Sequence, residues 1–561
     1  MDDRTIVPTE TWDQAISTAL PREQLERVAR HPAGQGQDIP HVMVEVDRLQ
    51  DLLERRSPVT RLPPEILAYI FGLYVAFLGE LTADDGVPAH KELFSLAQVC
   101  KLWRAVAESD PRLWTSIHFY FPESHSSREE DVPRVKPMLD LYLKRSGALP
   151  ISLSLTDHRI YHSATEDLIA LLVDRLRTHG RRWKRISLRL SCGYFPLLFT
   201  FTSCDLSFLE DLYISGDVAP LRRTANGLFL NMESATNLKS FTYCGPGSFV
   251  EDILHLRWES LAEVSFQFAP YCGQLRSPPS RQFTRLAQCQ NITTCSLGIN
   301  QTWRPRGSQT ITLPRLQTLR VRRLTPDARA SYTIDPLILP QLQTLEIDAS
   351  ILVTWNEQWH DSTFSNLLAR SACTLLHLSI RDVKFGNNEL IRCLALSPAL
   401  TFLRFIPCPR SQNISDVVRR LDVSPTTARS QNQTQGQGPT ADSGPFLPQL
   451  REITLASSIE GYLGLIMATF CSRAGARARA AGVAALRRAE VVFLDLWHDT
   501  DVDRVRAPGA RLERGKVASF RADLAQWVSE NGSENGKEDE NKLEASVVVD
   551  SPYLAEYIDV Q

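Results

Sequence analysis

The feature that most constrains this fold is a loose apolar pattern, x-x-L-x-x-L-x-L, which recurs ten times between residues 183 and 455. Successive units begin 23 to 33 residues apart, followed by one last gap of 50 residues. The second and third apolar positions of the units are Ile186/Leu188, Leu212/Ile214, Phe241/Tyr243, Val264/Phe266, Cys295/Leu297, Leu319/Val321, Leu345/Ile347, Leu378/Ile380, Leu403/Phe405 and Ile453/Leu455. Each alternating pair predicts a short strand whose inward face needs a neighbour, and the next unit provides it.

Segments with helical apolar spacing separate many of these expected strands. They are Thr165–Thr178, Phe283–Cys289, Thr363–Ser371 and Glu389–Ala395. A strand followed by a helix at this period predicts a solenoid with parallel strands. The longest gap holds a low-complexity stretch at about 424–445, where one unit is either missing or looped out. The alternative is a set of unrelated α/β units with leucine-rich strands.

Three units also share the same lead-in sequence. Leu-Pro-x-Leu stands at Leu313–Leu316, Leu339–Leu342 and Leu447–Leu450. This spacing and period resemble leucine-rich repeats. That family places Asn or Cys three residues after the third apolar position, and only Asn300 and Cys408 do so here. The resemblance therefore implies a degenerate leucine-rich-repeat-like solenoid.

A different pattern, typical of amphipathic helices, occupies residues 62–117. Pro63 and Pro64 suit the first helical positions, where a missing N–H costs nothing. Glu65 follows on the favourable side of the helix dipole. Apolar residues at helical spacing then predict a helix that runs to about Leu78: Ile66, Leu67, Ile70, Phe71 and Tyr74.

A second apolar stripe predicts one further helix, and a proline-started turn follows it. The stripe comprises Leu93, Leu96, Cys100, Trp103 and Ala107, and the turn is Pro111–Trp114. Barely sixty residues are too few to bury so many large side chains by themselves. We therefore expect another subunit to cover part of this apolar surface.

These motifs resemble the F-box, in which Leu-Pro-x-Glu-Ile-Leu, Val-Cys-x-x-Trp-Arg and Pro-x-Leu-Trp follow in order. The resemblance implies docking to the Skp-type subunit of a Skp–cullin–F-box ubiquitin ligase. Carried onto this chain, the implied docking residues are Leu62, Pro63, Ile66, Leu67, Ile70, Phe71, Val99, Cys100, Trp103, Leu113 and Trp114. Some of them must be core instead, and we expect Trp103 to be core and Pro63 to be a contact.

Composition narrows the choice of compartment and partner. A formal net charge of −3 over 561 residues gives no general attraction to nucleic acid or anionic membranes. Eleven scattered cysteines without a Cys-x-x-Cys pair predict thiols in a reducing compartment. No leader sequence is evident, and the longest apolar run, Ile66–Leu78, is too short to span a bilayer. We expect a cytoplasmic or nuclear protein.

No motif predicts a catalytic site, a cofactor or a metal. Phosphate loops, dinucleotide-binding glycines and zinc-protease signatures are absent from the sequence. Gly245–Ser248 reads as a turn, because its proline removes an N–H that a phosphate cradle needs. His158 and His162 have helical spacing but no third ligand, and Cys100 is expected to be an inert thiol in a helix interface.

The sequence thus predicts a mixed α+β and α/β chain in four parts. Residues 1–57 form a lead-in with a short helix, 58–118 the F-box-like helices, 119–528 the solenoid, and 529–561 a disordered acidic tail. Strands are also expected at Ser116–Phe121 and Leu149–Leu155, and an Ala-rich solvated helix at Arg473–Arg488.

The predicted function is that of an adaptor that does no bond chemistry and holds an unknown target protein for ubiquitin transfer. Target recognition is expected on exposed strand residues: Tyr213, Tyr243, Gln267, Arg320, Arg322, Glu346, Arg381 and Arg404. Two alternatives stay open, a repeat module that acts outside any ligase and an enzyme whose site forms only in three dimensions.

Overall fold

The computed structural model describes a subset of the chain. The described residues are 62–85, 90–121, 131–157, 170–171, 174–175, 177–191, 205–217, 230–245, 254–267, 282–299, 310–323, 334–349, 363–381, 383, 387–406, 415–423, 445–457, 463–473, 475–494 and 544–550. The chain divides into a first unit, residues 1–74 and 93–110, and a second unit, residues 75–92 and 111–561. Each unit is described by itself below.

Helices α4 (Pro64–Asp85), α5 (His90–Val99) and α6 (Lys101–Ser109) supply the described part of the first unit, α4 as far as Tyr74. The carbonyl of Pro63 accepts hydrogen bonds from the backbone N–H groups of Ile66 and Leu67, which starts α4. The helix was expected to end near Leu78 and continues to Asp85.

The expectation of one helix across residues 93–107 was wrong, because Cys100 separates α5 from α6. Its backbone is extended, with φ −159° and ψ 171°, and its sulfur accepts the N–H of Trp103 at 3.5 Å. Cys100 is therefore the N-cap of α6. Arg104 Nε donates to the carbonyl of Ala97 at 3.0 Å and joins the two short helices.

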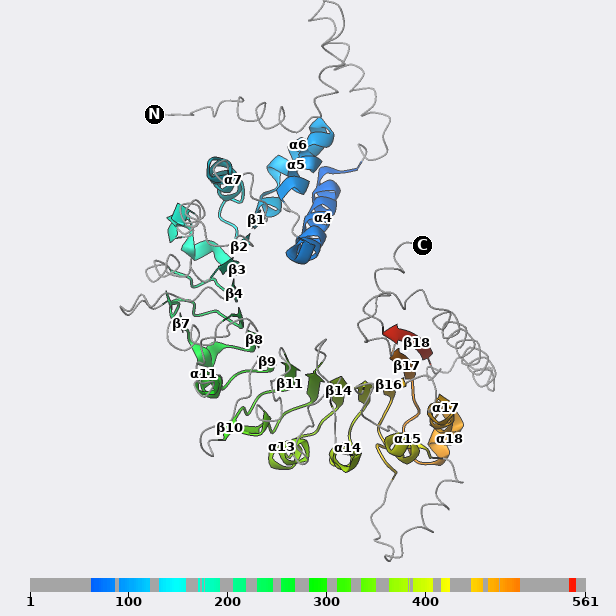
Figure 1. Cartoon of the computed structure of the whole chain (residues 1–561). Coiled ribbons are helices and arrows are strands. Elements are labelled where there is room, and N and C mark those ends of the chain that lie inside the picture. The colour runs from blue at the N-terminus through cyan, green and yellow to red at the C-terminus, as the bar shows by residue number, and fades with distance from the viewer. Residues whose placement is uncertain are drawn as a thin grey trace, which may run out of the picture. The chain divides into compact units, whose positions relative to one another are not determined.

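In the described part of the second unit, fourteen strands form one sheet (Figure 1). In sheet order they are β1 (Ser116–Phe121), β2 (Ile151–Asp157), β3 (Trp183–Ser191), β4 (Asp211–Asp217), β6 (Ser240–Cys244), β8 (Glu263–Gln267), β9 (Thr294–Ile299), β11 (Thr318–Arg323), β13 (Thr344–Asp348), β14 (His377–Arg381), β15 (Phe402–Ile406), β16 (Glu452–Ser457), β17 (Arg488–Leu494) and β18 (Glu544–Asp550). Every pairing between neighbours is parallel.

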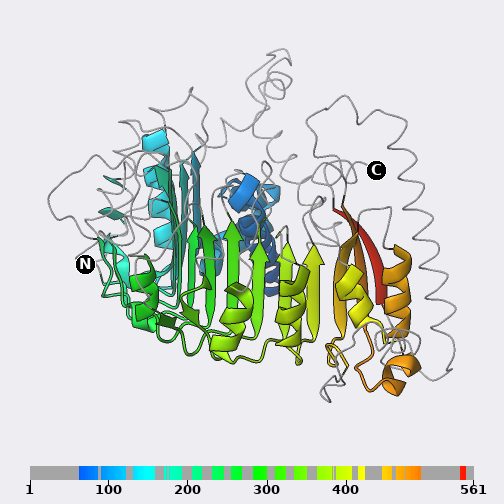
Figure 2. The same ribbon diagram turned by 60° about the horizontal axis from the view of Figure 1, so that its bottom comes forward.

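Short helices and minor strands accompany this sheet in the described part of the second unit. They are η2 (Pro111–Trp114), α7 (Asp131–Arg145), η3 (Gly180–Arg182), η6 (Trp258–Ser260), α11 (Gln282–Gln288), α13 (Thr363–Ser371), α14 (Asn387–Ala395), α15 (Ser415–Leu421), α17 (Leu463–Ser472) and α18 (Gly475–Ala480), with the strand pairs β5 (Leu230–Asn231)/β7 (Leu254–His255) and β10 (Ile311–Thr312)/β12 (Leu337–Ile338). Helices α11, α13, α14 and α15 lie on one face of the sheet, as Figures 1 and 2 show.

The register of the sheet matches the repeated sequence pattern. The second apolar positions of all ten units form one continuous ladder, from Ile186 opposite Leu212 through to Leu403 opposite Ile453. These side chains are buried on the helix-covered side. The parallel strands predicted from the sequence are confirmed, and the pattern marks the core face of each strand.

The ladder extends beyond the ten units at both ends. Strands β1 and β2 precede them, and β17 and β18 follow. Glu544–Asp550, which was expected to lie in a disordered tail, forms β18 in parallel register with β17. Across the 50-residue gap β15 pairs directly with β16, so in the described part of the chain no strand of this sheet lies between them.

Two other expectations concern residues of this unit. The expected solvated helix at Arg473–Arg488 is instead the short helix α18 followed by turns and the start of β17, and Arg473 is fully buried. The short helix expected in the lead-in and the low-complexity residues 424–444 lie outside the described residues.

Candidate functional site

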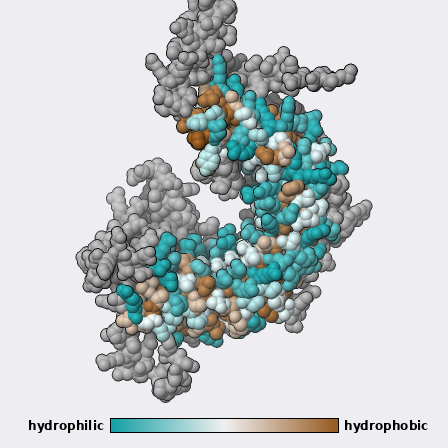
Figure 3. Space-filling view, turned by 180° about the vertical axis from the view of Figure 1, so that it is seen from behind, coloured by the Kyte–Doolittle hydropathy of each residue, from teal (hydrophilic) through white to brown (hydrophobic). Residues whose placement is uncertain are grey.

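Helix α4 carries two apolar stripes with opposite exposure. Leu67 and Phe71 are each 1% exposed, and Phe71 packs on the Trp103 ring with centroids 4.9 Å apart. Ile66 is 47% exposed, Ile70 43% and Leu73 55%. Positions 66, 70 and 73 fall on one side of a helix. The first unit therefore keeps one stripe for its own core and presents the other outward, where Figure 3 shows hydrophobic surface.

The remaining docking residues predicted in the first unit differ in their exposure. Leu62, Cys100 and Trp103 are half-buried, whereas Pro63 and Val99 are exposed. Tyr69 and Tyr74 add exposed aromatic surface on α4, and neither is among the docking residues that the F-box resemblance implied. Helical spacing alone could not assign these tyrosines to the docking face, since it does not say which stripe of α4 faces the core.

Leu113 and Trp114, the third motif, belong to the second unit and are buried there. The Trp114 ring meets Tyr142 edge-on at 5.0 Å between centroids, and the Arg145 guanidinium lies 4.4 Å from the ring centroid. Burial raises the pKa of the Tyr142 hydroxyl well above its usual range. In the second unit these two residues thus have the surroundings of core side chains.

The strand face opposite the helices is polar. One row of side chains across it runs Ser187, Tyr213, Thr242, Ser265, Ser296, Arg320, Glu346, Ser379, Arg404, Thr454 and Glu490. Charged neighbours pair along the rows: Arg320 Nε lies 2.9 Å from Glu346 Oε2, and Arg185 Nε 2.8 Å from Asp211 Oδ2. This open strand face offers a succession of hydrogen-bonding groups.

Seven of the eight residues expected on the recognition surface lie on the open strand face. Tyr243 does not; it is fully buried, and the expectation was wrong for this residue. It occupies the third apolar position of its unit, so its ring replaces an aliphatic side chain in the core. A Cβ at Gly245 would lie 2.7 Å from the Tyr243 hydroxyl, so this turn needs a glycine.

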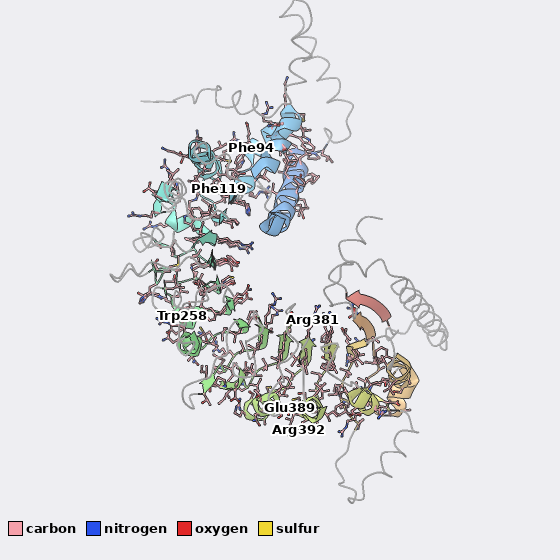
Figure 4. All side chains as sticks on the ribbon, viewed as in Figure 1. Phe94, Phe119, Trp258, Arg381, Glu389 and Arg392 are labelled. Carbon is pink, nitrogen blue, oxygen red and sulfur yellow. The ribbon has the colours of Figure 1, made fainter. Side chains whose placement is uncertain are left out.

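A hollow of about 260 Å³ lies on the open strand face between β8 and β15. Four arginines and two carboxylates line it: Arg320, Arg322, Arg381, Arg404, Glu346 and Asp348. Figure 4 shows Arg381 on the side of the sheet opposite Glu389 and Arg392 of α14. We call this hollow the arginine pocket.

Other candidate chemistry is sparse in the described part of the chain. No three His, Cys, Asp or Glu side chains there are grouped as metal ligands, and His158 and His162 lie outside it. Burial raises the pKa of the Cys289 thiol to about 12, and Cys295 and Cys393 are likewise buried. Among these residues, no helix is both long and apolar enough to cross a bilayer.

Comparison with known proteins gives one positive finding. The model of the F-box-like family matches residues 59–120, which contain all three motifs and the whole of α4, α5 and α6. The resemblance of this segment to the F-box is thus confirmed, and the segment is an F-box-like domain. A search of curated proteins returned no match.

Proposed function

We propose that this chain is the target-binding adaptor of a Skp–cullin–F-box ubiquitin ligase. The observation that carries the proposal is the exposed stripe Ile66, Ile70 and Leu73 within an F-box-like domain. Covering each such side chain is worth about 1.5–3 kcal/mol. An apolar stripe of this kind on a solvent-exposed surface marks an interaction site. A Skp-type subunit is the partner that the F-box-like domain implies.

Exposure divides the docking residues into two groups. Pro63, Ile66, Ile70 and Val99 are the contacts, with half-buried Leu62 and Cys100 at their margin. Leu67, Phe71 and Trp103 hold the helices together and shape the contact face from behind. Leu113 and Trp114, which are buried in the second unit, are core residues.

The second unit supplies the target-binding half of the proposed adaptor. It is a degenerate leucine-rich-repeat solenoid, and its open strand face receives the target protein. The adaptor does no bond chemistry itself. It raises the local concentration of the target beside a cullin-bound ubiquitin-transfer machinery, in the cytoplasm or nucleus.

Substitution on the exposed stripe tests the docking claim. We expect Ile66→Asp and Ile70→Asp each to weaken co-purification with a Skp-type subunit by tens-fold, because a buried unpaired carboxylate costs about 2–3 kcal/mol. Glu65→Ala, an exposed polar change on the same turn, is the control. Hydrogen exchange of the strands checks that the second unit is intact.

Unchanged capture by both aspartate variants would refute the docking face. Failure of the unmodified, folded chain to capture any Skp-type subunit would instead favour a repeat module that acts outside a ligase.

A further inference from the structure

We propose that the chain can be cleaved within residues 424–444 while its two parts stay joined in one sheet, because the side chain of Arg473 bonds to both ends of that segment. We call residues 424–444 the insertion. The inference does not depend on the adaptor function, since it concerns how the solenoid tolerates a break. Such a junction lets a protease act on the insertion, or an added segment occupy it, without loss of the open strand face.

The insertion lies inside one repeat of the solenoid and does not replace a repeat. Strand β15, helix α15 and strand β16 follow one another along the chain, and β15 pairs directly with β16. The longest gap between units therefore contains one strand-and-helix repeat together with the insertion. In sequence, the insertion has no aromatic residue and no Val, Ile, Leu, Met or Cys. It therefore offers none of the side chains that form the core ladder.

Arg473, just after α17, joins the two ends of the insertion. Its side chain is fully buried. Its Nε donates to the carbonyl of Leu421, the last residue of α15, at 2.7 Å. Its Nη1 donates to the carbonyl of Leu447 at 3.0 Å, and its Nη2 to that of Phe446. The guanidinium is planar, and its donors form a rigid fork. One side chain thus fixes backbone from before the insertion against backbone from after it.

Two buried hydroxyls of α17 add further bonds across the same junction. The Ser472 hydroxyl accepts the N–H of Val423 at 3.2 Å. The Thr469 hydroxyl donates to the carbonyl of Val418 in α15, also at 3.2 Å. Residues that follow the insertion therefore hold the residues that precede it at several points. None of these bonds involves the insertion itself.

The turn after the insertion depends on the same contacts. Leu447 has φ 49°, in the left-handed region that a leucine rarely adopts. Its side chain is buried, and its carbonyl accepts a hydrogen bond from Arg473. A backbone conformation of this kind persists only where the surrounding structure fixes it. Here the core and the guanidinium fix it, so we expect the turn to keep its conformation when the chain is cut upstream.

A cleavable variant of the full chain tests the proposal. A recognition sequence for a site-specific protease is placed between Gln435 and Gly436, and cleavage is completed under native conditions. We expect both fragments to elute together in size-exclusion chromatography. We also expect the amides of β15 and β16 to keep the hydrogen-exchange protection measured before cleavage. Hydrogen bonds and core contacts across the junction remain after the cut, and only the covalent link is lost.

Substitutions then identify what holds the fragments together. In the cleaved chain, Arg473→Met should speed separation of the fragments at least about tenfold, because three buried carbonyls lose their charged donor. Before cleavage the same variant should elute as the unmodified chain does. Arg479→Met, which removes an exposed arginine of α18, is the matched control and should leave the cleaved fragments associated.

A milder variant keeps the test decisive where Arg473→Met does not fold. Ser472→Ala removes the acceptor of the Val423 N–H and should speed separation of the cleaved fragments about fivefold. A shortened chain gives an independent measurement. Replacement of the insertion by about four Gly and Ser residues should shift the unfolding temperature by less than about 2–4 °C.

Four results would overturn the proposal. The first is separation of the unmodified fragments on cleavage, and the second is loss of protection in β15 and β16. The third is an equal rate of separation for the unmodified, Arg473→Met and Ser472→Ala fragments, which would mean that the bonds across the junction do not hold it. The fourth is a larger fall in the unfolding temperature of the shortened chain, which would mean that the insertion itself supports the fold.

Discussion

The exposed stripe of α4 and the open strand face are both uncovered surfaces, yet their chemistry is opposite. Ile66, Ile70 and Leu73 present hydrocarbon to solvent, which is unfavourable until another surface covers it. The strand face presents hydroxyls and paired charges that water satisfies well. The first surface therefore suits a lasting partner, whereas the second suits a ligand that comes and goes.

The interiors of the two units also differ, both in size and in what they bury. The described core of the first unit is small and centres on Leu67, Phe71 and Leu93. The second unit buries a continuous apolar ladder from strand to strand and can even bury a charge. Arg473 is fully enclosed and donates to the backbone carbonyls of Leu421, Phe446 and Leu447. The described helices of the first unit therefore share a few large apolar side chains, whereas the second unit repeats its core from strand to strand.

The strongest way to separate the two stripes of α4 is to truncate one residue from each. Phe71→Ala should cost about 3–5 kcal/mol, because it opens a cavity beside Trp103. Its neighbour Ile70→Ala should leave the helices folded and weaken only capture of the Skp-type subunit. Hydrogen exchange of α4 and α6 measures the first effect, and co-purification the second. Equal loss of protection in both variants would contradict the division into core and contact faces.

The second prediction tests whether the second unit depends on its buried charge. Arg473→Met should destabilise the region of α15 and α17 by about 3 kcal/mol, because it leaves three carbonyl acceptors without their charged donor. Burial already lowers the pKa of Arg473 to about 10, so its charge is held against a desolvation cost. Urea unfolding followed by exchange of these helices measures the loss.

A matched variant makes this test specific. Arg479→Met removes an exposed arginine of α18 and should change stability by less than about 0.5 kcal/mol. Similar effects for both variants would mean that the enclosed hydrogen bonds of Arg473 add nothing.

What the sequence could predict follows from the range of the interactions involved. Apolar alternation with period two is local, and it identified the core positions of ten strands in their observed register. It failed for β18, since nothing near Glu544–Asp550 shows that β17 is its neighbour. For Tyr243 the alternation correctly marked a core position, and its inclusion among the exposed recognition residues was wrong, because a tyrosine side chain is at once polar and apolar.

The candidate sites show the same limit. The motifs located the F-box-like helices, but only packing shows that Leu67 and Phe71 point inward while Ile66 and Ile70 point outward. The break at Cys100 was missed because its apolar spacing continues through the cap. The arginine pocket gathers residues from Gln267 of β8 to Arg404 of β15, and no local pattern links them.

The smallest predicted effect concerns the open strand face itself. Arg185→Gln breaks the exposed ion pair with Asp211, and we expect the free energy of unfolding to fall by less than about 1 kcal/mol. Solvent screens such a pair, and the side chains below it in the ladder, such as Ile186, remain buried. Urea denaturation at low and high salt is the measurement, with Ile186→Ala as the contrasting core variant, expected to cost about 2–5 kcal/mol.

If Arg185→Gln approached the cost of Ile186→Ala, the polar rows would be part of what holds the sheet together. They would then not be free to exchange their partners for a ligand. A small effect means that the open strand face can be altered by binding without loss of the fold, as a surface for a passing target requires.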